Sequence, residues 1–262
     1  MIDVRDLTFS YPDGTLVFEG FSWHVEAGEA WAVLGPSGCG KTTLLYLLAG
    51  LRRPSAGEIL VGGESLTRPR PRTGLILQDF GLLPWATVRE NAALGLRLRG
   101  FYGPDGTHAP PEASGVALTA AAVRAQVDPW LERLGLDSVS GSFPAQISGG
   151  QRQRTAIART FVLGPDLLLM DEPFAALDAP TRESLQNLTL QLQAESGLTT
   201  VVVTHTIEEA ALLGRTVLLL GRLPNRDARI VANPEAGRPE FREEPGYTAA
   251  CGRLRHALEA VA

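Results

Sequence analysis

The sequence contains 262 residues, of which 44% are hydrophobic and 20% charged, and its 24 Lys and Arg against 29 Asp and Glu give a net charge of −5. This length and apolar content suffice to bury a core, which excludes a disordered chain, and no apolar run approaches the ~18 residues of a membrane-spanning helix. The negative charge argues against nucleic-acid binding by overall charge, while two cysteines and an acidic N-terminal segment favour a cytoplasmic protein without a disulfide framework or signal peptide.

The first part of the chain has the pattern of an α/β fold. In chain order, the sequence predicts short edge strands over residues 8–11 and 16–18, a buried strand over 30–34, a helix over 42–49 and an edge strand over 58–61. The helix follows a glycine-rich loop, and Gly50 stands where a C-cap is expected.

Strand patterns disappear over residues 80–160, where helices are predicted over 88–98 and 120–134. This change predicts a helical subdomain inserted into the α/β core. Between the two helices, residues 100–115 are rich in Gly and Pro, and we interpret them as a solvated loop.

Apolar runs return after the helical region. Residues 167–170, 199–203 and 217–220 predict buried parallel strands joined by crossover helices. From Asn225 the chain is polar and ends in a predicted helix over 250–260. We therefore expect one domain over residues 1–224 and a short C-terminal tail over 225–262; the α/β core takes residues 1–79 and 161–224, and the helical subdomain takes 80–160.

The loop before the helix 42–49 matches the phosphate-binding pattern G-x-x-x-x-G-K-[ST]. It consists of Gly35, Pro36, Ser37, Gly38, Cys39, Gly40, Lys41 and Thr42. Glycines let successive N–H groups turn inward around an anion, and the helix adds its positive end. Lys41 suits the β- and γ-phosphates, and the Thr42 hydroxyl suits Mg²⁺. A chance glycine turn is the alternative, but the strand before the loop and the helix after it favour nucleotide binding.

Cys39 lies inside this loop, where the simplest interpretation is a small residue that the loop tolerates. Beside Lys41 and a helix N-terminus, its thiol is expected to have a lowered pKa. Alkylation of Cys39 should then inactivate the protein, and ATP should protect it.

The strand predicted over 167–170 ends in two acids, Asp171 and Glu172. A core strand rarely carries adjacent carboxylates without a function, and the carboxyl end of a parallel strand faces the ligand crevice. Asp171 is suited to the Mg²⁺ shell and Glu172 to polarising the attacking water. Together with the phosphate loop, these acids predict an ATPase.

A second glycine-rich turn, which opens another helix, precedes the two acids. It consists of Ile147, Ser148, Gly149, Gly150 and Gln151. On these residues and the order of the motifs, the chain resembles the ATP-binding-cassette (ABC) family, whose signature is Leu-Ser-Gly-Gly-Gln. The resemblance covers nearly the whole chain. It implies an α/β fold: a P-loop NTPase (RecA-like) core with an inserted helical subdomain and an N-terminal antiparallel β edge.

The resemblance also implies roles for single residues. Tyr11 resembles the aromatic residue that stacks on adenine, Gln78 the glutamine that senses Mg²⁺ and the γ-phosphate, and His205 the switch histidine. Thr206 departs from the aspartate often found after this histidine. Without the other motifs, Tyr11 and His205 would be interpreted as structural residues. The resemblance thus implies one ATP and Mg²⁺ site. Its catalytic residues are Glu172, His205 and Gln78, and its metal ligands are Thr42, Gln78 and Asp171. The nucleotide-binding residues are Tyr11, the phosphate loop 35–42, Thr43, residues 148–151 and the D-loop residue Asp178.

Resemblance to this family implies a homodimer in which two cassettes lie head to tail. ATP on the phosphate loop of one copy is then covered by residues 148–151 of the other. The resemblance further implies transmembrane permease subunits on separate chains, a solute-binding protein reached through them, and a peripheral position at the cytoplasmic face of the inner membrane. Nucleic acid is not an expected partner. Trp85, in the apolar stretch 80–85, is a candidate docking residue, with core packing as an equal alternative.

Residues 82–91 and 173–178 resemble the ATPases of bacterial nitrate, sulfonate and taurine importers, and the short C-terminal tail agrees with this subfamily. The 100–115 segment departs from the usual length. A soluble non-transport ABC-type ATPase is the alternative function, although such relatives usually carry two cassettes, long coiled coils or basic extensions. An unrelated P-loop kinase or GTPase would leave residues 148–151 unexplained.

Overall fold

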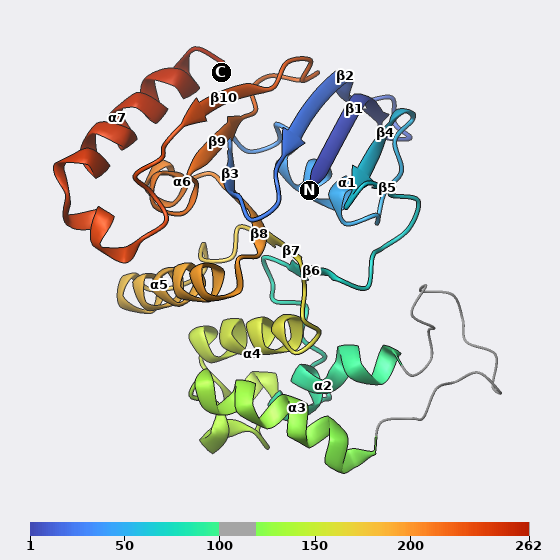
Figure 1. Cartoon of the computed structure of the whole chain (residues 1–262), viewed down its shortest axis with the longest axis vertical. Helices are drawn as coiled ribbons and strands as arrows, with labels where there is room; N and C mark the ends of the chain where they lie inside the picture. Colours follow the sequence, from blue (N-terminus) through green and yellow to red (C-terminus); the bar gives the residue numbers. More distant parts are fainter. Residues whose placement is uncertain (100–118, 262) are drawn as a thin grey trace. The chain divides into compact units, whose positions relative to one another are not determined.

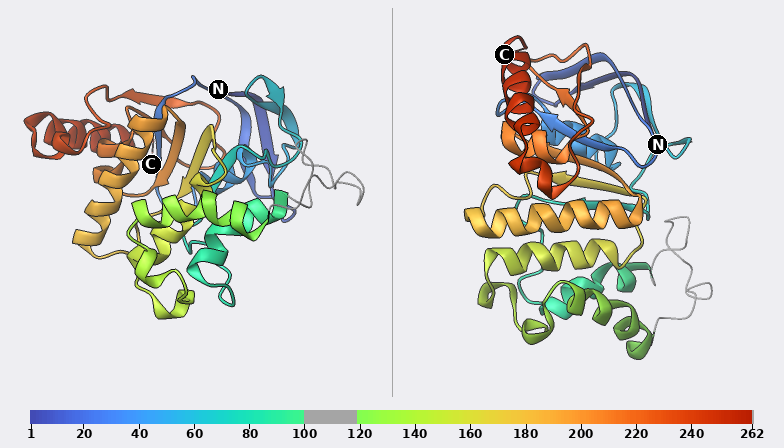
Figure 2. Two further views of the ribbon diagram at one scale, coloured as in Figure 1. Left: turned by 60° about the horizontal axis from the view of Figure 1, so that its bottom comes forward. Right: turned by 60° about the vertical axis from the view of Figure 1, so that its left-hand side comes forward.

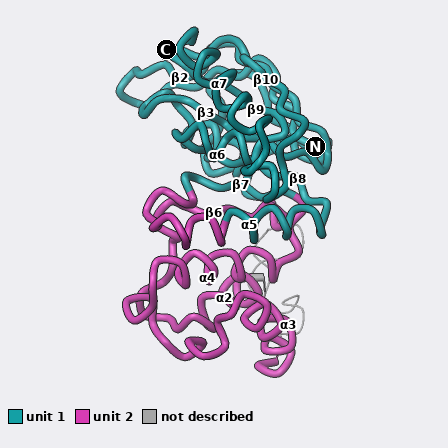
Figure 3. The backbone as a smooth tube through the Cα atoms, turned by 90° about the vertical axis from the view of Figure 1, so that its left-hand side faces the viewer, with its two compact units in different colours: residues 1–69, 167–172, 186–262 teal, residues 70–166, 173–185 magenta. Residues whose placement is uncertain are grey.

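The computed structural model describes residues 1–99 and 119–261 (Figure 1). The predicted loop 100–115 therefore lies outside the described residues. The chain forms two compact units, which are coloured separately in Figure 3. Unit 1 comprises residues 1–69, 167–172 and 186–262, and unit 2 comprises residues 70–166 and 173–185.

An antiparallel sheet begins unit 1. It contains β1 (Ile2–Ser10), β2 (Leu16–Val25), β4 (Ala56–Val61) and β5 (Glu64–Ser65), in the order β2-β1-β4-β5. The three predicted strands are thus confirmed as strands, but only β2 lies at an edge of the sheet, because β1 pairs with both β2 and β4 and β4 also pairs with β5. β1 also begins at Ile2 rather than at residue 8. Its buried side chains, Ile2, Val4, Leu7 and Phe9, change phase between Val4 and Leu7, where the register with β2 shifts. This irregularity hides the regular alternation by which a strand is recognised in sequence.

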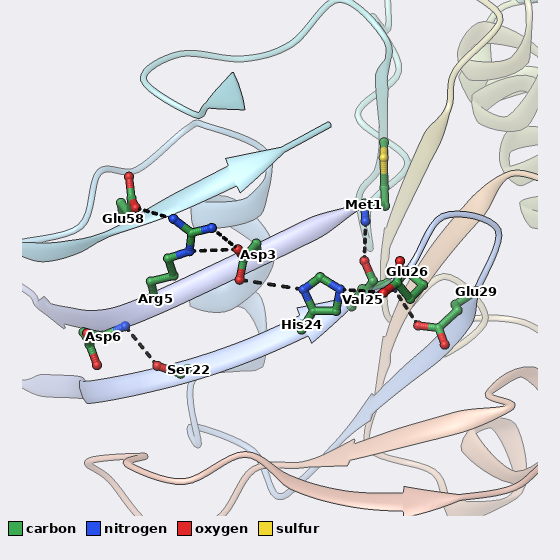
Figure 4. Close-up of polar contacts among 10 residues, drawn as sticks. All are labelled: Met1, Asp3, Arg5, Asp6, Ser22, His24, Val25, Glu26, Glu29 and Glu58. Carbon is green, nitrogen blue, oxygen red and sulfur yellow. Dashed lines mark hydrogen bonds and ion pairs between the residues drawn. The ribbon is translucent and has the colours of Figure 1, made fainter. Parts of the chain in front are cut away.

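Charged side chains cross the exposed face of this sheet, as Figure 4 shows. The Arg5 guanidinium on β1 donates to Asp3 at 2.8 Å and to Glu58 on β4 at 3.0 Å. On β2, the His24 imidazole lies 3.0 Å from Glu26 and 3.7 Å from Asp3. Exposed pairs of this kind contribute little to stability, about 0–1 kcal/mol each, so the sheet depends on its apolar face.

The second sheet of unit 1 is the predicted parallel core. Its strands β3 (Ala30–Leu34), β7 (Leu167–Asp171), β8 (Thr199–Thr204), β9 (Thr216–Leu219) and β10 (Arg229–Ala232) follow the order β10-β9-β3-β8-β7. β9, β3, β8 and β7 are parallel, and β10 pairs antiparallel with β9. Every residue of β3, β7 and β8 is buried, as expected for parallel strands. α1 (Lys41–Leu48) follows β3, and α6 (Ile207–Leu213) follows β8.

The segment after residue 225 is built into unit 1. It supplies β10 to the core sheet, followed by the short helix η3 (Pro239–Glu243) and by α7 (Pro245–Glu259). α7 lies beside α6 in both views of Figure 2, and Phe241, Cys251 and Leu254 pack into one apolar cluster with residues of α6 and the sheet. The expected tail 225–262 thus contributes core packing as well as its predicted helix, which begins at Pro245 rather than at residue 250.

Unit 2 holds the expected helical region. Its elements are β6 (Thr73–Ile76), α2 (Val88–Arg99), α3 (Ala120–Arg133), η1 (Asp137–Val139), η2 (Pro144–Gln146) and α4 (Gly149–Phe161). Unit 2 also includes β6, because this strand packs on α4, so it begins earlier than the expected boundary at residue 80. α5 (Ala179–Ser196) starts in unit 2 and ends in unit 1. Among the described residues, none of the helices combines the length and apolar character that crossing a membrane requires.

Candidate functional site

The glycine-rich loop joins β3 to α1, where the sequence places it. Steric crowding explains two of its glycines. A Cβ at Gly35 would lie 2.5 Å from the Leu220 carbonyl oxygen, and one at Gly40 would lie 2.6 Å from Val17. Gly40 also has a φ of 100°, in the left-handed region that favours glycine. The ammonium of Lys41, only 5% exposed, donates to the carbonyls of Gly35 and Pro36 at 2.8 and 2.9 Å, which holds the cation within the loop.

Asn225 braces this loop from a distant part of the chain. Its buried side-chain amide donates to the carbonyl of Cys39 at 2.8 Å and accepts from the Gly221 N–H at 3.1 Å. Its backbone N–H donates to Val17 on β2 at 2.9 Å. Sequence reasoning missed Asn225, because no motif links a polar residue near the C-terminus to a loop near the N-terminus.

Thr42 and Asp171 form the first oxygen pair beside the loop. The Thr42 hydroxyl donates to Asp171 Oδ1 at 3.1 Å, which joins the start of α1 to the end of β7. Burial raises the pKa of Asp171 above its ordinary value, against the lowering effect of the Thr42 hydrogen bond. A desolvated carboxylate beside a hydroxyl provides the hard oxygen donors that Mg²⁺ prefers, so these residues fit the predicted cation.

Cys39 differs from expectation. Its side chain is 4% exposed, and burial raises the pKa of its thiol, outweighing the lowering effect of Lys41. The predicted lowered pKa is therefore wrong: the helix N-terminus and the lysine are both present, but desolvation of a thiolate costs more than they return. An inward-facing, protonated thiol is a poor target for the alkylation that the sequence suggested.

Glu172 and His205 are brought together in unit 1. His205 Nδ1 lies 2.9 Å from Glu172 Oε2, although 32 residues separate them in the sequence. Glu172 has a positive φ of 42°, and its N–H donates to the Val203 carbonyl at 2.9 Å. A non-glycine residue is thus held in a sparsely populated backbone region directly after β7, a feature that clusters at functional sites. The proposed base and the proposed switch histidine thus lie within ion-pair distance of each other.

The backbone around His205 is fixed by three polar neighbours. The Thr204 hydroxyl donates to the buried Glu209 carboxylate at 2.6 Å and accepts from the Thr206 N–H at 3.1 Å. The Thr206 hydroxyl lies 3.1 Å from that of Thr204. Thr206, the departure from the family pattern, therefore takes part in a local network. The role of Glu209 was not anticipated, since a glutamate in the first turn of a helix is commonplace.

Tyr11 lies against the phosphate loop. Its hydroxyl is 2.8 Å from the Thr43 hydroxyl, one residue beyond Thr42 at the start of α1. Phe9 meets its ring edge-on at a centroid distance of 5.2 Å. The structure therefore brings Tyr11, the loop, Asp171, Glu172 and His205 into unit 1.

The other predicted site residues belong to unit 2. Ser148 is the N-cap of α4: its hydroxyl accepts from the Gln151 N–H at 3.2 Å, and the Gln151 side chain accepts from the Ser148 N–H at 2.9 Å. A Cβ at Gly149 or Gly150 would lie 3.3 Å from Leu177 or 2.6 Å from Thr181. The signature turn therefore packs closely on the D-loop segment.

Asp178 and Gln78 are exposed residues of unit 2. Asp178 accepts from the Thr181 N–H at 3.1 Å, and this hydrogen bond lowers its pKa. It thereby satisfies an N–H at the start of α5. Both residues belong to unit 2, so the metal and catalytic role of Gln78 and the nucleotide-binding role of Asp178 stay predictions.

Comparisons with known proteins agree on one family. The family model described as ABC transporter matches residues 18–175. The chain is 38% identical over 226 residues to the aliphatic sulfonates import ATP-binding protein SsuB of Bacillus cereus, covering 86% of this chain and 82% of that protein. It is also 38% identical over 227 residues to the taurine import ATP-binding protein TauB of Roseobacter denitrificans, covering 86% and 78%.

Solved structures of similar fold include a dimeric, post-hydrolysis state of the ATP-binding cassette MJ0796 bound to ADP and Pi. It has a TM-score of 0.74 and 28% identity and covers 88% of this chain and 98% of that one. Another is cbiO1 from Clostridium perfringens, part of the ABC transporter complex cbiONQ, with a TM-score of 0.73 and 26% identity over 98% of both chains. Both likenesses support the predicted P-loop core with an N-terminal antiparallel sheet.

Proposed function

This chain belongs to the ABC transporter family as an ATPase subunit, and we propose that it powers solute import through separate membrane subunits. The observation that carries the proposal is the pair Glu172–His205, one residue beyond the Thr42–Asp171 contact. A phosphate loop, two metal-suited oxygens and a carboxylate oriented by a histidine are what ATP hydrolysis requires.

Each group has one task in this proposal. Lys41 and the loop N–H groups bind the β- and γ-phosphates, for which Lys41 is already held inside the loop. Thr42 and Asp171 would hold Mg²⁺, which would neutralise phosphate charge, and Gln78 is the further ligand that the family resemblance implies. Glu172 is the general base. His205 Nδ1, 2.9 Å from Glu172 Oε2, would hold that oxygen and leave Oε1 to accept a proton from the attacking water.

The proposal includes a head-to-tail homodimer bridged by ATP. The family relative MJ0796 is described as dimeric with ADP and Pi bound. In this chain the N-terminus of α4 is exposed at Ser148, so its N–H groups and positive helix end are accessible to a partner's phosphates. Asp178 lies at the start of α5, in the segment on which the signature turn packs, and is the D-loop member of this interface.

Transmembrane permease subunits are the second proposed partner, and through them a solute-binding protein. Trp85 is 73% exposed and Phe143 is 41% exposed; both belong to unit 2. Large exposed aromatic residues suit a protein interface, so the observed exposure of Trp85 favours docking over core packing. This assembly would place the chain at the cytoplasmic face of the inner membrane. SsuB and TauB are named for sulfonate and taurine import, which makes a small organic sulfonate the first solute to test, ahead of nitrate.

Substitution Glu172→Gln tests the catalytic assignment. Loss of a general base lowers turnover by about 10²- to 10⁴-fold, while ATP binding persists and the ATP-bound form accumulates as a dimer on size exclusion. The exposed Glu208→Gln is the charge-matched control and should retain turnover. Wild-type turnover in Glu172→Gln would place the base elsewhere. Import itself is tested in proteoliposomes with the cognate membrane subunits and binding protein, where taurine or an alkanesulfonate should stimulate ATP hydrolysis; absence of stimulation would reject that solute class.

A further inference from the structure

A guanidinium covers the ring of Tyr11. Arg52 Cζ lies 4.8 Å from the centroid of the Tyr11 ring and 5.9 Å from that of Phe9. Arg52 lies in the turn after α1, where its backbone N–H donates to the Tyr46 carbonyl at 3.2 Å. The arginine and Tyr11 thus come from the two ends of a segment that contains the whole phosphate loop.

Ring stacking accounts for the position of this guanidinium. Arg52 Nε is buried and has no hydrogen-bond partner among the described residues. A buried, unpaired N–H is costly, but a planar and weakly hydrated guanidinium is stabilised over an aromatic face. The contact with Tyr11 is therefore a specific feature of the side chain, distinct from a solvated surface charge.

The distances also show which side of Tyr11 is covered. Arg52 to Tyr11, Arg52 to Phe9 and Phe9 to Tyr11 are all of similar length, at 4.8, 5.9 and 5.2 Å. The three groups therefore form a triangle. Had Arg52 and Phe9 covered opposite faces of Tyr11, their separation would approach the sum of their distances to it. Arg52 takes one face, Phe9 meets the ring near its edge, and neither covers the second face.

We propose that Arg52 is a positioning residue for the nucleotide base: it backs the Tyr11 ring so that the opposite face is presented to a purine. This proposal rests on the role of Tyr11 in the proposed function. The ring is held at its hydroxyl by Thr43 and at one face by Arg52. A side chain fixed before binding loses less conformational freedom when a base stacks on it.

The proposal predicts an effect that depends on the base and not on the phosphates. Arg52→Ala raises the Kd for MgADP by about 2- to 5-fold, the size of an exposed cation–π contact, and leaves the Kd for magnesium pyrophosphate unchanged. Both are measured by calorimetry, since neither ligand is a hydrolysis substrate. In steady state, KM for ATP rises by a similar factor while kcat is unchanged. Arg52→Lys keeps the charge but loses the planar guanidinium, so its Kd for MgADP should lie between those of the wild-type protein and Arg52→Ala.

Two controls identify the cause. The exposed neighbour Arg53→Ala removes the same charge and should leave both Kd values unchanged. On a Tyr11→Leu background, Arg52→Ala should have no further effect on MgADP, because the two residues act through one ring. Thermal unfolding of each variant separates this effect from loss of fold.

Equal weakening of MgADP and pyrophosphate would overturn the proposal, because Arg52 would then act on the phosphates by charge. An unchanged MgADP affinity in Arg52→Ala would overturn it as well. The proposed function fails differently: if Tyr11→Leu leaves MgADP affinity intact, Tyr11 does not stack on the base, and if wild-type protein binds neither ligand, the phosphate-loop assignment is wrong.

Discussion

The N-termini of α1 and α4 are two glycine-rich helix starts that are completed in different ways. At α1 the N-cap Gly40 offers no side-chain hydrogen bond to the first turn. At α4 the N-cap Ser148 and Gln151 satisfy each other's N–H groups in a capping box. An uncapped helix start keeps its N–H groups available for an anion, whereas the capping box at α4 already uses the N–H groups of Ser148 and Gln151 and leaves those of Gly149 and Gly150 outside it.

The atoms that crowd the glycines of the two turns also differ. In the loop before α1, Gly40 is crowded by a side chain, that of Val17, but Gly35 is also hemmed in by the backbone carbonyl of Leu220. Gly149 and Gly150 face side chains alone, those of Leu177 and Thr181. Backbone cannot move aside, but side chains can. The loop before α1 is therefore a fixed receptor for phosphate. The turn before α4 is stabilised by its own capping box and contacts the partner's nucleotide only after that nucleotide has bound to the partner's phosphate loop.

Substitution Ser148→Arg tests this division with the largest effect. Because the signature turn serves the partner's nucleotide, a bulky cation there should lower turnover by at least about 100-fold, the scale of a lost transition-state contact, without weakening ATP binding to the monomer. Ser148→Thr, which keeps the capping hydroxyl, is the control. Normal ATPase activity in Ser148→Arg would contradict the shared site.

Lys41→Ala tests the receptor side. Loss of a charge-assisted contact to phosphate weakens ATP binding by about 10- to 100-fold, measured by calorimetry. Lys41 is the sole lysine in the sequence, so an amine-reactive reagent can modify only this side chain and the N-terminal amine. Nucleotide should protect Lys41 from the reagent and leave the N-terminus reactive; equal protection of both, or of neither, would count against the assignment.

Asn225→Ala tests whether the receptor is fixed from outside the loop. The change leaves the Cys39 carbonyl and the Gly221 N–H without their buried partner, which costs about 1–3 kcal/mol of stability, and it should also weaken ATP binding. Asn233→Ala is the matched control, because the amide of Asn233 is equally buried and donates to Ala211 and Gly214, residues outside the phosphate loop. Denaturant unfolding should show similar losses for the two variants, with reduced ATP affinity confined to Asn225→Ala. Equal ATP affinity in the two would make Asn225 a purely structural residue.

These two helix starts also show what the sequence could predict. Both motifs are local: the residue types, their spacing and the adjoining strand and helix signals lie within a dozen residues, so position and chemistry follow from the pattern. The parallel strands β3, β7 and β8 are predictable for the same reason, since each is built on a short run of apolar residues and is buried throughout.

The brace by Asn225 and the cover by Arg52 could not be predicted. Both depend on tertiary contacts between segments far apart in the chain, and Asn and Arg near turns are ordinary in any sequence. The predicted lowering of the Cys39 pKa was wrong because of burial. Lys41 lowers the pKa, but desolvation of the buried thiol raises it by more, and residue spacing does not reveal how deeply a side chain is buried. Local patterns thus fixed the identity of the groups, while tertiary packing set their environment.

The smallest expected effect concerns this thiol, and it tests how closed the α1 loop is. Because burial raises the pKa of Cys39 above its ordinary 9.0, the folded protein holds the thiol protonated at pH 7–8, and iodoacetamide should modify it more slowly than a free cysteine. The rate of modification should climb only as the pH rises past 9.0. Above this pH the thiol ionises in the unfolded state before it does so in the folded state, so the free energy of unfolding begins to fall. Mass spectrometry of the Cys39 peptide over a pH series measures this, with Cys251, which is also buried with a raised pKa, as an internal reference. Rapid labelling of Cys39 alone at neutral pH would mean that the loop opens in the absence of nucleotide and is no fixed receptor.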